Sequence, residues 1–414
     1  MNSVIMNRVS IFIVFILTLF FTGCREEDVE SVVSEDDIEL KVKLFFNSES
    51  HVIDGFTRTS GDAVRDIKTF CILVYGEDGS LFRLIPKDEL SIVFRLRNED
   101  RPDDIPDELW HQAESKTMMG ETSIRLTKGY YRIYALANMG NNLEGYNSDD
   151  YSTIDRLRSI VLKWNESEIA SNNQMFGYFS TDAGKSDGFE APLIGSYINN
   201  GGYTIYSWLK RTASKVTVAV DGSQLNSGVH VYIKSIQVKD IAGTCLLGEN
   251  NTDPEVLIEE GEKIIVSDIP GKTSVNSDGV VFKGWNYPNP KSNAHTEMAN
   301  ALYFFENMQG EGQWKGQVWP DQSDKSRPMF PDGNDKDSKG YKDGKPKGTY
   351  VEVVAYYVNR DDEGPITYRF MLGSNITTNY DVQRNHHYKL TLKLKNNAND
   401  CDWHVVYNPT SKEE

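Results

Sequence analysis

Several stretches of this sequence alternate apolar and polar residues with a period of two, and this pattern restricts the fold more than any other feature. In residues 38–46, written IELKVKLFF, Ile38, Leu40 and Val42 alternate with charged residues. Such alternation is typical of a β-strand with one buried face, because successive side chains of a strand point to opposite sides. Comparable runs lie at 123–140, 202–222, 228–243, 349–373 and 384–395.

Short turn signals join these runs into hairpins. Asp78-Gly79 separates two apolar runs within 66–85, and Lys128-Gly129 does the same within 123–140. Asp-Gly is one of the strongest short hairpin signals, since glycine accepts the backbone angles that a tight turn needs. Helical periodicity is confined to 104–115 and 150–162. The sequence therefore predicts an all-β fold, a sandwich or a barrel.

The length of 414 residues exceeds that of an ordinary single domain. One block of strands ends near 207–212 and another opens directly after it. We therefore predict a signal peptide at 1–23, an acidic tether at 24–37, an N-terminal β-sandwich domain at 38–208 and a C-terminal one at 209–414.

The N-terminal apolar run is typical of a removable signal rather than of a membrane span. It extends over about 13 residues, whereas a spanning helix needs roughly 20. It ends in Phe21-Thr22-Gly23-Cys24, which resembles a bacterial lipobox, and an acidic cluster follows that resembles the export signal of Bacteroidetes surface lipoproteins. We predict that Cys24 becomes lipidated and anchors the mature chain to the outer membrane. The alternative is an ordinary signal peptide with a chance cysteine.

Composition argues against several functions. The net charge of −17 disfavours nucleic acid as a partner, because phosphates require a basic face. No CxxC spacing and no common catalytic motif occurs in the sequence. The adjacent His386 and His387 point to opposite faces if they lie in a strand, so they cannot hold one metal ion together. Oxygen-donor residues at 332–337 loosely match a calcium loop without its final glutamate. We expect no catalysis and no cofactor.

Several segments together resemble the fimbrillins of Bacteroidales, the subunits of surface fimbriae. They include DGFTRTSGDAVRDIKTF, GYYRIYALANMG, LKRTASKVTVAV, ALYFFENMQG and RNHHYKLTLKL, in this order along the chain. The resemblance covers most of 38–395. It implies two tandem transthyretin-like, Greek-key β-sandwich domains and export as a lipoprotein.

The resemblance also implies a route of assembly. In polymerising fimbrillins an arginine-specific protease cuts after the first strand, the freed strand leaves, and a terminal strand of the next subunit fills the groove. Here the departing strand would be 38–46, and cleavage would fall between Arg58 and Thr59, with Arg65 as the competing site. The donor strand would be the C-terminal tail, with Trp403, Val405 and Tyr407 as the pocket-filling face.

Other interpretations stay open at this stage. The apolar part of the tail is short, so it could instead close the C-terminal sandwich, as in a tip subunit that accepts a strand without donating one. Stalk, tip and anchor roles are not distinguished, although Arg58 argues modestly against an anchor. Expected partners are other fimbrial subunits, the outer membrane and adhesion ligands on host or bacterial surfaces. The alternative of another class is a surface glycan-binding lipoprotein of a nutrient-uptake system.

Overall fold

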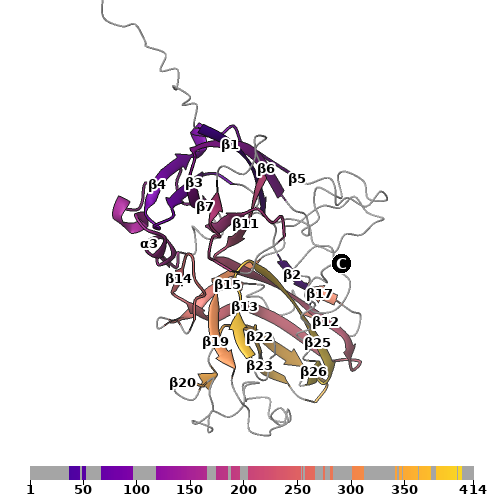
Figure 1. The fold of residues 1–414 in the computed structure, drawn as a ribbon. Helices are drawn as coiled ribbons and strands as arrows, with labels where there is room; N and C mark the ends of the chain where they lie inside the picture. The colour runs from indigo at the N-terminus through magenta and orange to yellow at the C-terminus, as the bar shows by residue number, and fades with distance from the viewer. Residues whose placement is uncertain are drawn as a thin grey trace, which may run out of the picture.

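The computed structural model describes a chain built almost entirely of β-strands (Figure 1). The prediction of an all-β fold is confirmed. The structure describes residues 37–46, 49–52, 67–96, 118–165, 174–184, 188–195, 204–252, 254, 257–265, 274–275, 280–282, 301–311, 341–342, 345–346, 348–361, 363–373, 379–398 and 400–402.

The first half of the chain forms a nine-stranded sheet, here called the N-terminal sheet, in the order β4-β3-β7-β9-β11-β1-β6-β5, with β10 beside β7. Its strands are β1 (Asp37–Phe46), β3 (Phe70–Gly76), β4 (Leu81–Pro86), β5 (Val93–Leu96), β6 (Met118–Thr127), β7 (Tyr130–Ala137), β9 (Met175–Ser180), β10 (Ile194–Gly195) and β11 (Thr204–Arg211). The hairpin predicted at Asp78-Gly79 is present. The one predicted at Lys128-Gly129 is wrong: β6 pairs with β1 and β5, whereas β7 pairs with β3, β9 and β10, so this turn joins two strands that both line the core but are not bonded to each other. β3 turns into β4 at Gly79, whose φ of 79° is the left-handed conformation that glycine adopts without strain.

The two ends of the N-terminal sheet are brought together by a very short connection. The edge strands β4 and β5 are linked through a single 3₁₀ turn, η1 (Lys87–Glu89). Arg83 on β4 donates to the backbone carbonyl of Arg125 on β6 at 3.5 Å, across the gap between the sheet ends. The sheet therefore curls around its own apolar core, which β1, β3, β6, β7 and β11 all line.

The second half of the chain, together with β2 from the N-terminal segment, forms two sheets. One, the β25 sheet, has the order β17-β12-β25-β2, with β18 beside β12 and β26 beside β25; the other, the β13 sheet, has the order β15-β13-β22-β23, with β16 beside β13. The strands are β2 (Glu49–Val52), β12 (Ala213–Leu225), β13 (His230–Ala242), β15 (Leu257–Ile265), β16 (Ser274–Val275), β17 (Val280–Phe282), β18 (Leu302–Phe305), β22 (Tyr350–Val358), β23 (Glu363–Met371), β25 (His386–Asn396) and β26 (Asp400–Asp402). Three two-stranded ladders involve β8 (Val161–Lys163) with β14 (Thr244–Leu246), β19 (Asn307–Glu311) with β24 (Asn379–Val382), and β20 (Tyr341–Lys342) with β21 (Lys345–Pro346).

The β25 and β13 sheets share one apolar core. Val216 on β12 and Leu392 on β25 belong to the same buried cluster as Val231 on β13 and Val353 on β22. Side chains from two sheets that interleave in one layer define a sandwich. Figure 1 shows this sandwich below the N-terminal sheet.

The two halves are joined tightly. β11 ends at Arg211 and β12 begins at Ala213, so only Thr212 separates them, and the predicted domain boundary at 208/209 falls inside β11. β14 from the second half pairs with β8 from the first half. A third buried cluster lies between the halves and includes Tyr134 and Phe305. The division into two domains remains a prediction.

Helical structure is limited. The segment 150–162, predicted to be helical, contains α3 (Ile154–Arg158) and the end of η3 (Ser148–Tyr151), and Thr153 caps α3 by accepting from the backbone amide of Arg156. The predicted helix at 104–115 lies outside the described residues. Among the residues that are described, no helix has both the length and the apolar character to cross a membrane.

Candidate strand-exchange site

The strand predicted to depart, β1, lies between two neighbours within the N-terminal sheet. It pairs antiparallel with β6 from Asp37↔Thr127 to Phe46↔Met118. Within the described residues, it pairs parallel with β11 from Lys41↔Thr204 to Phe46↔Leu209. The last six residues of β1 are therefore bonded on both sides, so the strand can leave only if both ladders open.

One face of β1 is inserted into the core of the N-terminal sheet. Leu40, Val42, Leu44 and Phe46 expose between 0 and 1% of their surface, as the period-two pattern predicted. Burial of an aliphatic or aromatic side chain contributes about 1.5–3 kcal/mol, so the four together contribute roughly 6–12 kcal/mol as an upper bound. That is comparable to the whole stability of a typical domain, about 5–15 kcal/mol. A sheet that loses β1 must refill the same positions.

The outward face of β1 makes polar and aromatic contacts. Lys43 pairs with Glu121 on β6 at 3.2 Å, and the Ser123 hydroxyl donates to Glu39 at 2.6 Å. The Phe45 ring stacks on Trp208 of β11, with ring centroids 4.9 Å apart. These contacts fix the register of β1 on both sides.

Directly after β1 the chain crosses to the other half of the molecule. β2 pairs parallel with β25, with Glu49 opposite His386 and Val52 opposite Lys389. In Figure 1 β2 lies among the strands of the second half, away from β1. Residues 37–52 thus contribute a strand to the N-terminal sheet and another to the β25 sheet.

The other predicted site residues lie outside the described part of the chain. These are Cys24, Arg58, Thr59, Arg65, Trp403, Val405 and Tyr407, together with the calcium-loop candidates at 332–337. Their neighbours in sequence are described, however. Arg58 and Arg65 fall between the end of β2 and Ile67, and Trp403 directly follows β26. Within the described residues, no group of three or more His, Cys, Asp or Glu side chains could hold a metal ion.

Two of the sequence motifs that carried the family resemblance meet in a buried ion pair at the junction of the halves. Arg384, just before β25, donates to the Glu306 carboxylate at 2.9 Å from Nε and 2.6 Å from Nη2. Both side chains are only 4% exposed. The guanidinium also donates to the carbonyls of Leu246 and Leu247 and lies over the Phe189 ring, 4.9 Å from its centroid.

Asn385 connects the same turn to β11. Its φ of 61° lies in the left-handed region, which asparagine tolerates better than most residues. Its side-chain oxygen accepts from both the backbone amide and the Nη1 group of Arg211, each at 3.2 Å. The next residues confirm the predicted split of the histidines, since His387 is buried against the Thr217 hydroxyl at 2.9 Å while His386 is partly exposed. These contacts join β11 of the first half to the turn before β25 in the second half.

Cys71 and Cys245 are buried in the cluster between the two halves. Both are free thiols with 0% exposure. Burial raises the pKa of each thiol to about 12, even though the Arg384 guanidinium beside Cys245 acts to lower it. Buried cysteines of this kind are inert and act as small apolar side chains.

These two thiols predict how stability depends on pH. Because the pKa values of these thiols in the folded state lie above 9.0, the ordinary value for a cysteine, the native state keeps protons that the unfolded state loses. The contribution to stability is complete below pH 9 and is lost as the pH rises from 9 to 12. Urea unfolding at pH 8.0, 9.5 and 10.5 checks this, with Cys71→Ala and Cys245→Ala expected to flatten the decline. An equal decline in the alanine variants would contradict the assignment.

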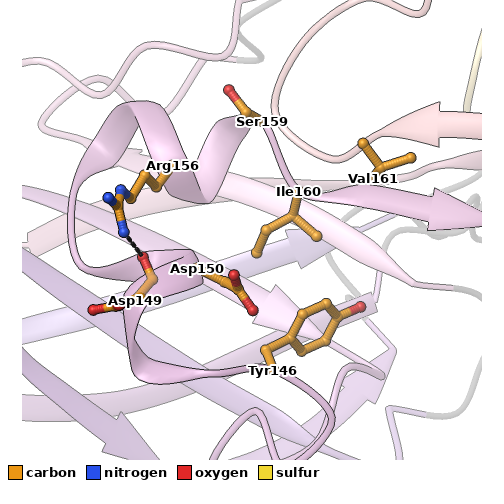
Figure 2. A pocket seen from close by; sticks show the side chains of 7 residues that line it. All are labelled: Tyr146, Asp149, Asp150, Arg156, Ser159, Ile160 and Val161. Atoms are coloured by element: carbon orange, nitrogen blue, oxygen red, sulfur yellow. Dashed lines mark hydrogen bonds between the residues drawn. The ribbon is translucent and has the colours of Figure 1, made fainter.

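A pocket of about 420 Å³ lies beside α3, and Figure 2 shows the side chains that line it. Tyr146, Asp149, Asp150, Arg156, Ser159, Ile160 and Val161 form its walls. Its polar groups are engaged locally: Arg156 donates to the Asp149 carbonyl at 3.0 Å, and Asp150 accepts from the Asn147 amide at 2.9 Å. The lining contains neither histidine nor cysteine, and it joins no nucleophile to a base.

Comparison with known proteins found one matching family model and several similar solved structures. A family model described as a domain of unknown function, DUF4906, matches residues 302–392, which include Glu306 and Arg384. None of the curated proteins matches the sequence.

Solved structures similar to this chain include three fimbrial proteins. The tip fimbrial protein Mfa3 from Porphyromonas gingivalis, with a C-terminal truncation, is 11% identical over 88% of this chain and 100% of that one, with a TM-score of 0.38. A fimbrial assembly protein from Parabacteroides distasonis is 12% identical over 89% and 95%, with a TM-score of 0.37. The fimbrial anchor protein Mfa2 from Porphyromonas gingivalis is 10% identical over 85% and 90%, with a TM-score of 0.26. Structures of this kind are what the sequence resemblance predicted.

Proposed function

We propose that this chain is a structural subunit, stalk or tip, of a cell-surface fimbria, with a role in adhesion, assembled by proteolysis-triggered donor-strand exchange. It is exported as a lipoprotein through Cys24 and reaches the outer membrane surface before cleavage. The observation that carries the proposal is the position of β1, a strand whose alternate side chains are buried and whose backbone is bonded on both sides.

The slot that β1 fills has the properties of a strand acceptor. Its two walls, β6 and β11, would present unpaired amides and carbonyls if β1 left, and backbone hydrogen bonds are what an incoming strand offers. The positions now filled by Leu40, Val42 and Leu44 would become pockets for alternate apolar side chains. The acceptor therefore selects a strand with the same period-two pattern.

The chain also contains a point at which β1 can be severed. Residues 53–66 connect β2 to Ile67, and both Arg58 and Arg65 lie within this connection. A cut at Arg58 would separate β1 and β2 from the rest of the chain without breaking any other described strand. The tail after β26, with Trp403, Val405 and Tyr407 as its apolar face, is the donor for the next subunit. Repeated head-to-tail contacts of this kind do not close, so they yield a filament.

The energy of β1 burial requires that departure and replacement be coupled. A subunit with an empty slot would lose roughly 6–12 kcal/mol of apolar burial, about as much as its total stability. We therefore expect the old strand to leave as the new one enters.

Replacing Arg58 tests the proposal directly. The recombinant chain from residue 25 is treated with an arginine-specific endopeptidase and analysed for detergent-resistant multimers. Wild type is expected to be cut between Arg58 and Thr59 and to give a ladder, whereas Arg58→Gln is expected to stay monomeric because its slot stays filled. Arg65→Gln is the matched control and is expected to behave as wild type.

Two outcomes would change the interpretation. A ladder from Arg58→Gln but none from Arg65→Gln would move the cleavage site to Arg65. Complete cleavage of wild type with no multimers at any protein concentration would overturn strand exchange as the mode of assembly.

A further inference from the structure

The edge of β25 is shared by two strands that come from opposite ends of the chain. β2 occupies the first part, from His386 to Lys389, in parallel orientation. β26 occupies the last part, from Lys393 to Lys395, in antiparallel orientation. β12 pairs with the other side of β25 from His387 to Asn396, with one irregularity in the register. On this edge of β25, the residues between Lys389 and Lys393 lie between the end of β2 and the end of β26.

The register of β26 determines where the following residues would lie if the ladder continued. Lys393 stands opposite Asp402 and Lys395 opposite Asp400, and opposite charges at paired positions favour this register. Each further residue toward the C-terminus moves the pairing one residue back along β25. Trp403 then reaches Leu392, Val405 reaches Leu390 and Tyr407 reaches Tyr388.

This continuation matches the apolar pattern of both strands. Leu392, Leu390 and Tyr388 are the residues of β25 that are buried in the core of the sandwich, at 0 to 2% exposure. Residues opposite each other in an antiparallel pair have side chains on the same face. The apolar residues of the tail would thus all fall on the core side, whereas a shift of one residue would place all of them on the other face.

The same continuation collides with β2. Val406 would pair with Lys389 and Pro409 with His386, and these four positions of β25 are the ones that Glu49–Val52 already pair with. Only Trp403 to Val405 can extend the ladder while β2 is in place.

We propose that β2 and residues 406–409 of the tail are alternative occupants of one edge of β25, so that the N-terminal segment keeps the end of the tail off its own sandwich. Loss of β2 lets the tail seat along β25 as far as Pro409. The biological setting of this switch, cleavage at Arg58, rests on the proposed function. A subunit that has lost its N-terminal segment then holds its own tail on β25 until a neighbouring slot takes it.

The test disrupts β2 while leaving β1 and the chain intact. Prolines at both positions 50 and 51 remove two adjacent amides, of which one must face β25 in a parallel ladder. In Ser50→Pro/His51→Pro, hydrogen exchange at the amides of 406–408 is expected to slow at least about tenfold relative to wild type, because they gain ladder bonds. Ser50→Ala/His51→Ala keeps both amides and is the matched control, expected to exchange as wild type.

The outcomes are distinct. Amides of 406–408 that are already slow in wild type, or that stay fast in the proline variant, overturn the inference. Slow exchange that appears only as protein concentration rises also overturns it, since the occupant would then be the tail of a second copy. Protection of the β13 amides from exchange shows that the double proline variant is folded. If the double variant does not fold, Val52→Pro replaces it in the same experiment, because Val52 pairs with Lys389 at the other end of β2.

Measurements on the cleaved chain distinguish a failure of this inference from a failure of the proposed function. Slow exchange at 406–408 in the proline variant supports the inference. If the cleaved wild-type chain nevertheless retains its N-terminal segment, that second result contradicts strand exchange. Loss of the segment after cleavage, with 406–408 still exchanging as fast as in the intact chain, contradicts the inference and leaves strand exchange standing.

Discussion

Arg384→Met is expected to lower the free energy of unfolding by about 3–5 kcal/mol, the cost of leaving a buried charge without its partner. The substitution keeps the length of the side chain but removes the cation from the Glu306 carboxylate, which is 4% exposed. It also removes the donors to the carbonyls of Leu246 and Leu247. Urea unfolding followed by intrinsic fluorescence measures the loss, provided that the transition is two-state.

Two variants test the cause of this loss. Arg384→Met/Glu306→Gln removes both charges and is expected to be more stable than Arg384→Met alone by at least about 1 kcal/mol, because no unpaired charge remains buried. Arg83→Met breaks a pair with Glu89 in which the side chains are 45% and 50% exposed, and is expected to cost less than about 1 kcal/mol. Equal losses for the buried and the exposed pair would show that the junction does not depend on its charges.

A peptide with the sequence of β1, residues 37–46, is expected to abolish multimer formation when it is added in excess to the cleaved chain. It fills the slot between β6 and β11 with the side chains that the slot already accommodates. Occupied slots cannot accept a neighbour's tail, so the ladder should collapse to monomers with bound peptide. Native gels and mass spectrometry of the complex measure both effects.

The matched control is the same peptide with Val42→Asp. Val42 is 1% exposed in β1, so the variant loses its apolar contribution of about 1.5–3 kcal/mol and must bury a carboxylate. Its affinity should fall at least roughly tenfold to a hundredfold, at 1.4 kcal/mol per factor of ten. Equal inhibition by both peptides would mean that the peptide acts elsewhere than in the slot.

Local sequence patterns predicted the strands that are long and regular. The alternation in IELKVKLFF marked β1, and Asp78-Gly79 marked the β3–β4 turn, because both signals arise from interactions within a few residues. The alternation also predicted the burial of Leu40, Val42 and Leu44, but not that of Phe45 on the opposite face. It carried no information on the two neighbours of β1, since these come from residues 118–127 and 204–211.

The parts of the site that were missed depend on distant partners. β2 has the sequence ESHV, too short and polar to suggest a strand, and its partner β25 lies more than 300 residues further along the chain. Glu306 and Arg384 stood in motifs that supported the family resemblance, yet nothing local indicated that they meet. A buried ion pair becomes visible only when both residues are placed in three dimensions, because Glu306 and Arg384 are 78 residues apart in the sequence.

The single residue between β11 and β12 has a mechanical consequence. Because Thr212 alone links a strand of the N-terminal sheet to a strand of the β25 sheet, tension applied to one half passes to the other through an extended backbone rather than through a slack linker. The antiparallel β8–β14 ladder is a second connection between the two halves, and it resists twisting about the first. A filament of such subunits would therefore be stiff within each subunit, and its curvature would concentrate at the contacts between successive subunits.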